Sequence, residues 1–174
     1  MTGEQDRVFG WNEVVRFRLP ADWRPDVEEH EGHPVAVFHP PAPAGGVLRL
    51  VTDRVAPKDG PDGVTAVLHE MALRFVRPDD PRASDRKVEP WCSGGGVDGN
   101  GNESEDGVRA QAVMLTQEDG RAEVHYLWLV GAERAGMAAV AMFSYGLPAI
   151  LDGDESCAGI LALLDKAIAS ADIL

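Results

Sequence analysis

The sequence is poor in cysteine, and this shortage limits the kinds of site it can build. Only Cys92 and Cys157 occur among the 174 residues, and they lie far apart and outside any metal-ligand spacing. A disulfide framework or a cysteine-rich metal site is therefore not expected. Two reduced thiols in a cytosolic protein is the simpler interpretation.

Positive charge is scarce as well. The chain has 16 Lys and Arg residues against 29 Asp and Glu residues, for a formal net charge of −13. Binding to nucleic acid needs a basic stripe that displaces counterions, and no stretch of the sequence supplies one. Anionic membrane surfaces should repel the chain in the same way. An acidic surface keeps a protein soluble, and it also attracts basic partner proteins.

Long apolar runs are missing too. The longest, around residues 137–143, is far too short to span a bilayer. The opening stretch "MTGEQDRVFGWNEVV" has no basic region followed by an apolar one, so we expect no signal peptide and a cytoplasmic location. The chain has 174 residues, which is long enough to bury a core, and 44% of them are hydrophobic, as in a globular protein. We therefore expect one domain over residues 1–174.

Hydrophobic periodicity predicts strands and two helices. Val15, Phe17 and Leu19 alternate with Arg16 and Arg18, which is typical of a half-buried strand. Similar patterns predict strands near residues 14–19, 35–39, 47–55, 87–92, 108–117, 122–131 and 137–145. Apolar residues at helical spacing predict helices near 63–76, with Asp62 as N-cap, and near 155–171, capped by Asp152 or Asp154.

Short turns join the later strands, so neighbouring strands are expected to be antiparallel. The prediction is an α+β fold. A single antiparallel sheet of about six to seven strands is flanked by the two helices.

Two stretches resemble the superfamily of PsbP, an extrinsic subunit of photosystem II, and the Mog-type Ran-binding proteins. One is "VVRFRLPADW" near the start, and the other is "AVAMFSYGLPAILDGDESCAGILALLDKAIASADIL" at the end. The resemblance implies an α/β/α sandwich around an antiparallel sheet. It also implies a mostly non-enzymatic role in partner binding or assembly support.

The glycine-rich stretch "WCSGGGVDGNGNESEDG", residues 91–107, is the most conspicuous candidate site. It fails as a phosphate-binding P-loop, because Asn100 stands where the lysine should be. It partly matches a calcium-binding EF-hand loop, whose oxygen ligands alternate along the chain. The matching ligand positions are Asp98, Asn100, Asn102, Ser104 and Asp106. Glu103 replaces the required glycine and Arg109 the closing glutamate, so we expect a solvated hairpin loop, with weak calcium binding as the alternative.

Other catalytic or metal patterns are incomplete. Cys92 has no nearby base in the sequence to activate it. His69 begins an H-E-x-x-H pattern, but Leu73 occupies the second histidine position. Three histidines occur within ten residues, His30, His33 and His39, and we expect them to be solvated or hydrogen-bonded rather than bound to a metal.

The sequence therefore favours a non-catalytic, cytoplasmic protein-binding or accessory domain of bacterial type, with no cofactor. The predicted contact face is Trp23 with the acidic residues Asp26, Glu28, Glu29 and Glu31, although Trp23 could instead pack over a sheet edge. The first alternative is a weak calcium or small-ligand protein that uses the 98–106 loop. A further alternative is an enzyme whose site is assembled from dispersed residues such as Glu123, His125 and Tyr145.

Overall fold

The computed structural model describes residues 5–95 and 107–174, which form ten strands and two α-helices. The strands are β1 (Asp6–Trp11), β2 (Val15–Pro20), β3 (Arg24–His30), β4 (His33–His39), β5 (Val47–Val55), β6 (Ala83–Trp91), β7 (Gly107–Glu118), β8 (Arg121–Arg134), β9 (Met137–Pro148) and β10 (Asp172–Ile173). The helices are α1 (Val64–Phe75) and α2 (Glu155–Ala169). Neither helix is long and apolar enough to cross a membrane, a finding that covers the described residues alone.

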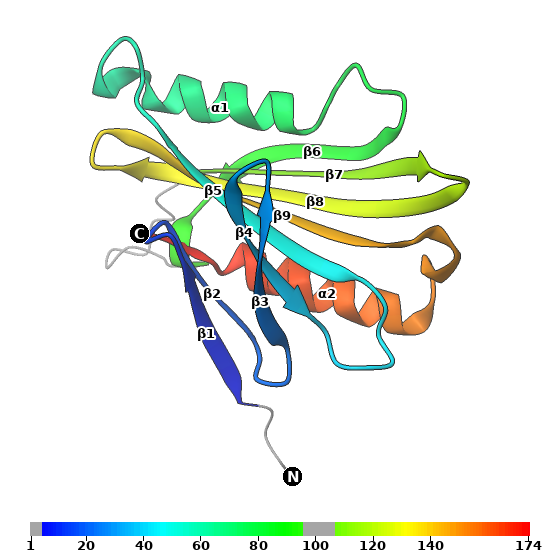
Figure 1. Ribbon diagram of the computed structural model, residues 1–174. Helices are drawn as coiled ribbons and strands as arrows, with labels where there is room; N and C mark the ends of the chain where they lie inside the picture. Colours follow the sequence, from blue (N-terminus) through cyan, green and yellow to red (C-terminus); the bar gives the residue numbers. More distant parts are fainter. Residues whose placement is uncertain (1–4, 96–106) are drawn as a thin grey trace.

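The strands form two antiparallel sheets (Figure 1). The larger has seven strands in the order β3-β4-β5-β9-β8-β7-β6, and the smaller has three in the order β1-β2-β10. The predicted α+β class with antiparallel pairing is confirmed, but the prediction of a single sheet is wrong. The first predicted strand, β2, does not join the large sheet. Its apolar side packs across that sheet instead, with the Phe17 ring 5.4 Å from Phe38 and 5.2 Å from Phe143.

Each segment predicted as a strand or helix from hydrophobic periodicity is a strand or helix of that kind in the structure. Three strands were not predicted: β1, β3 and β10. The residues of β3 are all exposed, so it has no apolar alternation to read, and β10 is only two residues long. Asp154 caps α2 by accepting a hydrogen bond from Ser156 N at 3.0 Å. The N-cap of α1 is Gly63, not Asp62 as predicted, and it makes no side-chain cap.

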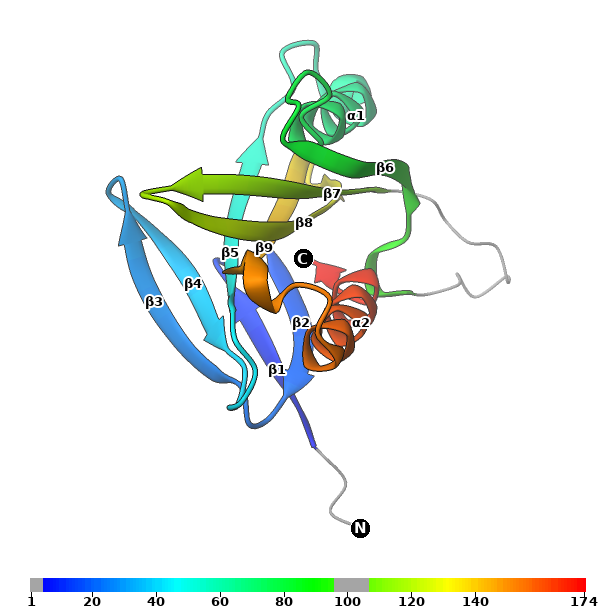
Figure 2. The same ribbon diagram turned by 90° about the vertical axis from the view of Figure 1, so that its right-hand side faces the viewer.

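The large sheet lies between two covering layers (Figure 2). On one face α1 packs through Val64, Leu68 and Ala72 against small and branched side chains of β7, β8 and β9. On the other face α2 and the small sheet enclose the main core, which contains most of the aromatic residues. Leu68 approaches the sheet closely, because an added Cβ at Gly131 would lie 2.9 Å from Leu68 Cδ2. The helices cover only part of the sheet, and β3 and β4 extend to the side opposite α2.

Candidate functional site

The predicted contact face is divided by the structure. Trp23 is only 2% exposed and belongs to the main core, so the prediction that it is a surface anchor is wrong. A turn after β2, closed by a hydrogen bond from Trp23 N to Pro20 O at 3.1 Å, directs its side chain inward. The acidic residues behave differently. Asp26, Glu28 and Glu29 lie on β3 and Glu31 in the turn that follows, and all four are exposed.

The acidic residues of β3 point to both faces of the large sheet. Asp26 and Glu28 are in register with Val37 and Val35 of β4, whereas Glu29 alternates to the other face beside Val27, which is 57% exposed. Glu28 Oε2 pairs with Arg49 Nε at 3.2 Å. β3 is the outer strand of the seven-stranded sheet, and no described strand pairs with its free edge.

The predicted calcium ligands, Asp98 to Asp106, lie outside the described residues. Across 5–95 and 107–174, no group of three or more His, Cys, Asp or Glu side chains is placed to hold a metal ion. His30 and His33 face each other in register at the β3–β4 turn and are exposed, and His39 lies at the far end of β4.

Of the three dispersed residues suggested as an enzyme site, Glu123 and His125 lie close together. His125 Nε2 lies 3.0 Å from Thr116 Oγ1 and 3.6 Å from Glu123 Oε2, on the face of the sheet that carries α1. Tyr145 lies on the opposite face, where it is buried and donates to Gly45 O at 2.5 Å. The three residues therefore do not form one site.

The His125 cluster also lacks the geometry of a catalytic triad. A general base needs a group on its second ring nitrogen to orient it, but Thr116 and Glu123 both approach Nε2. Nδ1 faces the backbone of β9, since an added Cβ at Gly146 would lie 2.9 Å from it. Burial lowers the pKa of His125; the nearby Glu123 opposes this effect and Arg49 adds to it. The cluster is thus a partly buried polar contact.

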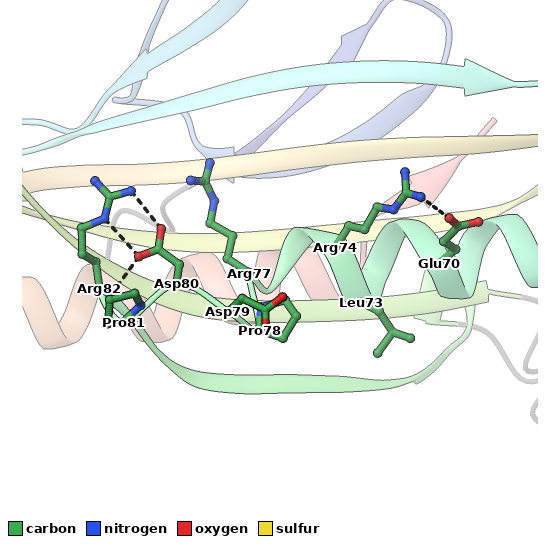
Figure 3. Close-up of a pocket in the computed structure, with 9 residues that line it drawn as sticks. All are labelled: Glu70, Leu73, Arg74, Arg77, Pro78, Asp79, Asp80, Pro81 and Arg82. Carbon is green, nitrogen blue, oxygen red and sulfur yellow. Dashed lines mark hydrogen bonds and ion pairs between the residues drawn. The ribbon is translucent and has the colours of Figure 1, made fainter.

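A hollow of about 790 Å³ lies beside the end of α1 and the segment that leads to β6 (Figure 3). Its charged lining residues are Glu70, Arg74, Arg77, Asp79, Asp80 and Arg82. Arg74 pairs with Glu70, and Arg82 pairs with Asp80 at 2.9 Å. The hydrogen bonds from Arg82 lower the pKa of Asp80 to about 2. Three arginines and three carboxylates line this open hollow, so their formal charges balance.

A smaller hollow of about 300 Å³ lies between α2 and the β6–β8 side of the large sheet, and we call it the α2 cleft. Its polar and aromatic lining residues are Asp85, Gln111, Tyr126, Trp128 and Asp165, from four different elements. Antiparallel register brings Gln111 beside Trp128 and Val113 beside Tyr126 on the face that packs on α2. The two aromatic rings are stacked, with centroids 6.5 Å apart.

Hydrogen bonds fix the walls of the α2 cleft. Asp165 Oδ1 accepts from Arg109 Nη2 and, at 3.4 Å, from Trp128 Nε1. Tyr126 OH donates to Asp152 Oδ1 at 2.5 Å. Burial, together with this bond, raises the pKa of Tyr126, so its hydroxyl stays protonated at neutral pH.

None of the α2 cleft residues was predicted as a site. The one sequence signal was in β7, where the polar residues Arg109 and Gln111 alternate with apolar neighbours although the strand is internal to the sheet. That pattern indicates a polar region on one face of a central strand. It does not say that Asp165, 56 residues further along, lies opposite.

Comparison with known proteins gives the fold alone. No protein-family model matches the sequence, and no curated protein matches it significantly. The structure is similar to that of a protein from Bacteroides thetaiotaomicron VPI-5482, with a TM-score of 0.56 and 18% identity. That alignment covers 100% of this chain but 49% of the other, so this chain spans about half the length of that protein.

The structure is also similar to that of LpqN from Mycobacterium tuberculosis, a protein described as involved in cell envelope biogenesis. The TM-score is 0.54 at 14% identity, over 97% of this chain and 90% of LpqN.

Proposed function

We propose that this chain is a non-catalytic accessory domain that binds a basic partner protein along the outer strand β3. The observation that carries this proposal is the exposure of the strand. All seven residues of β3 are exposed, and the strand carries Asp26, Glu28 and Glu29 at a sheet edge with no described partner strand. Unpaired backbone groups of an edge strand can accept another extended segment. Lysine or arginine side chains of such a segment would face these carboxylates.

The proposed kinship with the PsbP and Mog-type Ran-binding superfamily points the same way. The arrangement of an antiparallel sheet with a helix on each face supports it. The resemblance implies a role in partner binding or assembly support.

A pair of matched variants tests the contact surface. The first, the β3 variant, neutralises the acidic residues of β3 and of the turn that follows it by the changes Asp26→Asn, Glu28→Gln, Glu29→Gln and Glu31→Gln. The control neutralises four exposed acidic residues elsewhere by Asp59→Asn, Asp79→Asn, Glu118→Gln and Asp119→Asn. Partners captured by the unmodified protein are identified, and their association rates with all three proteins are measured at low and high salt.

Electrostatic attraction acts mainly on the association rate. We expect the β3 variant to associate about tenfold more slowly and with a weaker dependence on salt, and the control variant to stay near the unmodified rate. Equal association rates for the β3 variant and the unmodified protein would show that β3 is not the contact surface.

For the compartment, we propose the cytoplasm, because a chain with only two cysteines suits a reducing compartment. The likeness to LpqN raises an envelope role as the alternative, since cell envelope biogenesis is the process named for that protein. Fractionation of the cells that make this chain, with an antibody against it, separates the two. Recovery with the envelope fraction would contradict the cytoplasmic proposal.

A further inference from the structure

The α2 cleft combines an aromatic wall with carboxylates. Tyr126 is partly exposed, and its ring is held in place from two sides, by stacking on Trp128 and by the bond from its hydroxyl to Asp152. Donation of that hydrogen bond to a carboxylate makes the phenol ring more electron-rich. An electron-rich ring face attracts cations.

The charge in and around the α2 cleft is negative. Asp85 and Asp165 line it, Asp152 holds Tyr126, and Arg109 pairs with Asp165. Three carboxylates against one guanidinium group leave a net charge of −2, within a chain whose formal net charge is −13. An anionic ligand would be repelled here, and a cation would be attracted.

Asp85 is placed by a local distortion of β6. The pairing of β6 with β7 shifts register between Ser84 and Lys87, and Asp85 has a φ of 50°, a left-handed conformation. Such bulges redirect a side chain that regular pairing would point elsewhere. Asp85 is exposed and lines the cleft, so its carboxylate is accessible to a ligand.

The ligand should be an organic cation rather than a metal ion. The described residues hold no group of three carboxylate, thiol or imidazole side chains close enough to cage a metal, and an aromatic wall offers no ligand to a hard cation. A volume of about 300 Å³ is at the lower end of the range for small-molecule sites. That space suits one alkylammonium or guanidinium group.

We propose that the α2 cleft binds an organic cation, an alkylammonium or guanidinium group that lies over the ring of Tyr126 and pairs with Asp85 and the outer side of Asp165. The walls are fixed before binding, because Asp165 is held by Arg109 and Trp128, and Tyr126 by Asp152. Little conformational freedom is then lost when the ligand enters.

The same chemistry has two sources: a free small cation, or a lysine or arginine side chain of a partner. The site does not depend on β3, which forms one edge of the large sheet while β6, β7 and β8 lie toward the other. The proposal of a basic partner bound along β3 and the proposal of a cation bound in the α2 cleft can therefore be tested, and contradicted, independently.

The test is a titration followed by nuclear magnetic resonance of the Trp128 indole N–H, a group at the wall of the cleft. The free probes are n-butylguanidinium and the uncharged n-butylurea, which has nearly the same shape. The peptide probes are Gly-Ser-Arg-Ser-Gly and its citrulline counterpart. We expect n-butylguanidinium to bind with a Kd of about 1 mM and n-butylurea at least about tenfold more weakly.

The matched variants are Asp85→Asn and Asp119→Asn. Both remove one charge from an exposed aspartate with a left-handed backbone, φ 50° and 51°, a conformation that asparagine also tolerates. Thermal unfolding of each variant checks that the fold is kept. Asp85→Asn should weaken n-butylguanidinium binding about tenfold, and Asp119→Asn should leave it within about twofold.

Each outcome decides a point. Tighter binding of the arginine peptide than of the free cation assigns the cleft to a partner side chain, and tighter binding of the free cation assigns it to a small molecule; both support the proposal. Equal binding of the charged and uncharged probes would overturn it. So would an equal loss in the two variants, because the attraction would then come from the overall charge of the chain.

Discussion

The guanidinium group of Arg86 holds the carbonyl oxygen of Arg77 with two hydrogen bonds, from Nε at 3.2 Å and from Nη2 at 2.9 Å. Arg86 also donates to Val76 O at 2.9 Å and to Asp80 O at 2.7 Å. The last carbonyl groups of a helix have no partners within it, so a side chain from β6 caps the end of α1. This contact connects the helix to the outer strand beside it.

Removal of that cap should destabilise the fold. Arg86→Met keeps the aliphatic part of the side chain and removes all four hydrogen bonds, and we expect a loss of about 1–3 kcal/mol in the free energy of unfolding. Arg74→Met is the control, because Arg74 makes one exposed ion pair on the same helix and should cost less than about 0.5 kcal/mol. Urea denaturation measures both. If Arg86→Met and the unmodified protein unfolded at the same urea concentration, water would replace the hydrogen bonds of Arg86 without loss of stability.

Two glycine substitutions should change stability in opposite directions. At Gly131 an added Cβ would lie 2.7 Å from Val140 Cγ1 as well as close to Leu68, so Gly131→Ala should cost about 1–3 kcal/mol by displacing α1. At Gly159, inside α2, an added Cβ meets nothing within 4 Å. Gly159→Ala should stabilise the fold by about 0.5–1 kcal/mol, because alanine is the better helix former. A shift of the same sign in both variants would contradict this packing.

The stability of the fold should depend on His125 in mildly acid solution. Burial lowers the pKa of His125 below its ordinary value of 6.5, so the unfolded chain binds the proton more readily than the folded one. Stability is therefore full above pH 6.5 and falls as the pH drops from there through the folded pKa. In His125→Gln this part of the pH dependence should disappear. Melting temperatures measured from pH 8 down to about pH 5 test it, and parallel curves for the two proteins would refute it.

The thiol of Cys157 should be protected in the folded protein. Its residue is 5% exposed, and burial raises the pKa of the thiol, which lowers the fraction of reactive thiolate. We expect iodoacetamide to modify Cys157 at least about tenfold more slowly in the native protein than in urea. Mass spectrometry of tryptic peptides gives the rate at each cysteine. Similar rates in the two conditions would show that the start of α2 opens readily.

The calcium alternative has a direct test. If the 98–106 loop binds calcium with the millimolar affinity typical of incomplete sites, 5 mM calcium should stabilise the fold by about 1 kcal/mol. Asp98→Ala with Asp106→Ala should abolish that gain, whereas Asp119→Asn should keep it. No shift in melting temperature of the unmodified protein would remove calcium from consideration.

The sequence predicted the parts of the fold that depend on local burial. Alternation such as Val15, Phe17 and Leu19 reports directly on which side of a strand is covered, and helical spacing does so for α1 and α2. The sequence did not predict β3, because all residues of that strand are exposed and show no alternation of apolar and polar side chains. The second sheet could not be predicted either, because β2 pairs with β10 through Arg16 and Asp172, which are 156 residues apart.

The candidate sites show the same limit. The acidic residues that follow Trp23, from Asp26 to Glu31, are exposed, as expected for a contact face, since charged residues are rarely buried. Trp23 itself was misplaced, because nothing in the local sequence shows that the turn after Pro20 directs it into the core. The α2 cleft depends on contacts such as Arg109 with Asp165, which arise only when distant elements pack together.

The two outer strands of the large sheet differ in how well another chain could extend them. β6 is bent by the bulge at Asp85, which interrupts its row of hydrogen-bonding groups, whereas β3 pairs with β4 over its full seven residues without a break. Two copies of this protein that met along β3 would bring Asp26, Glu28 and Glu29 of one against those of the other. The carboxylates that would attract a basic chain therefore also keep copies apart in concentrated solution, so the open edge can persist without promoting aggregation.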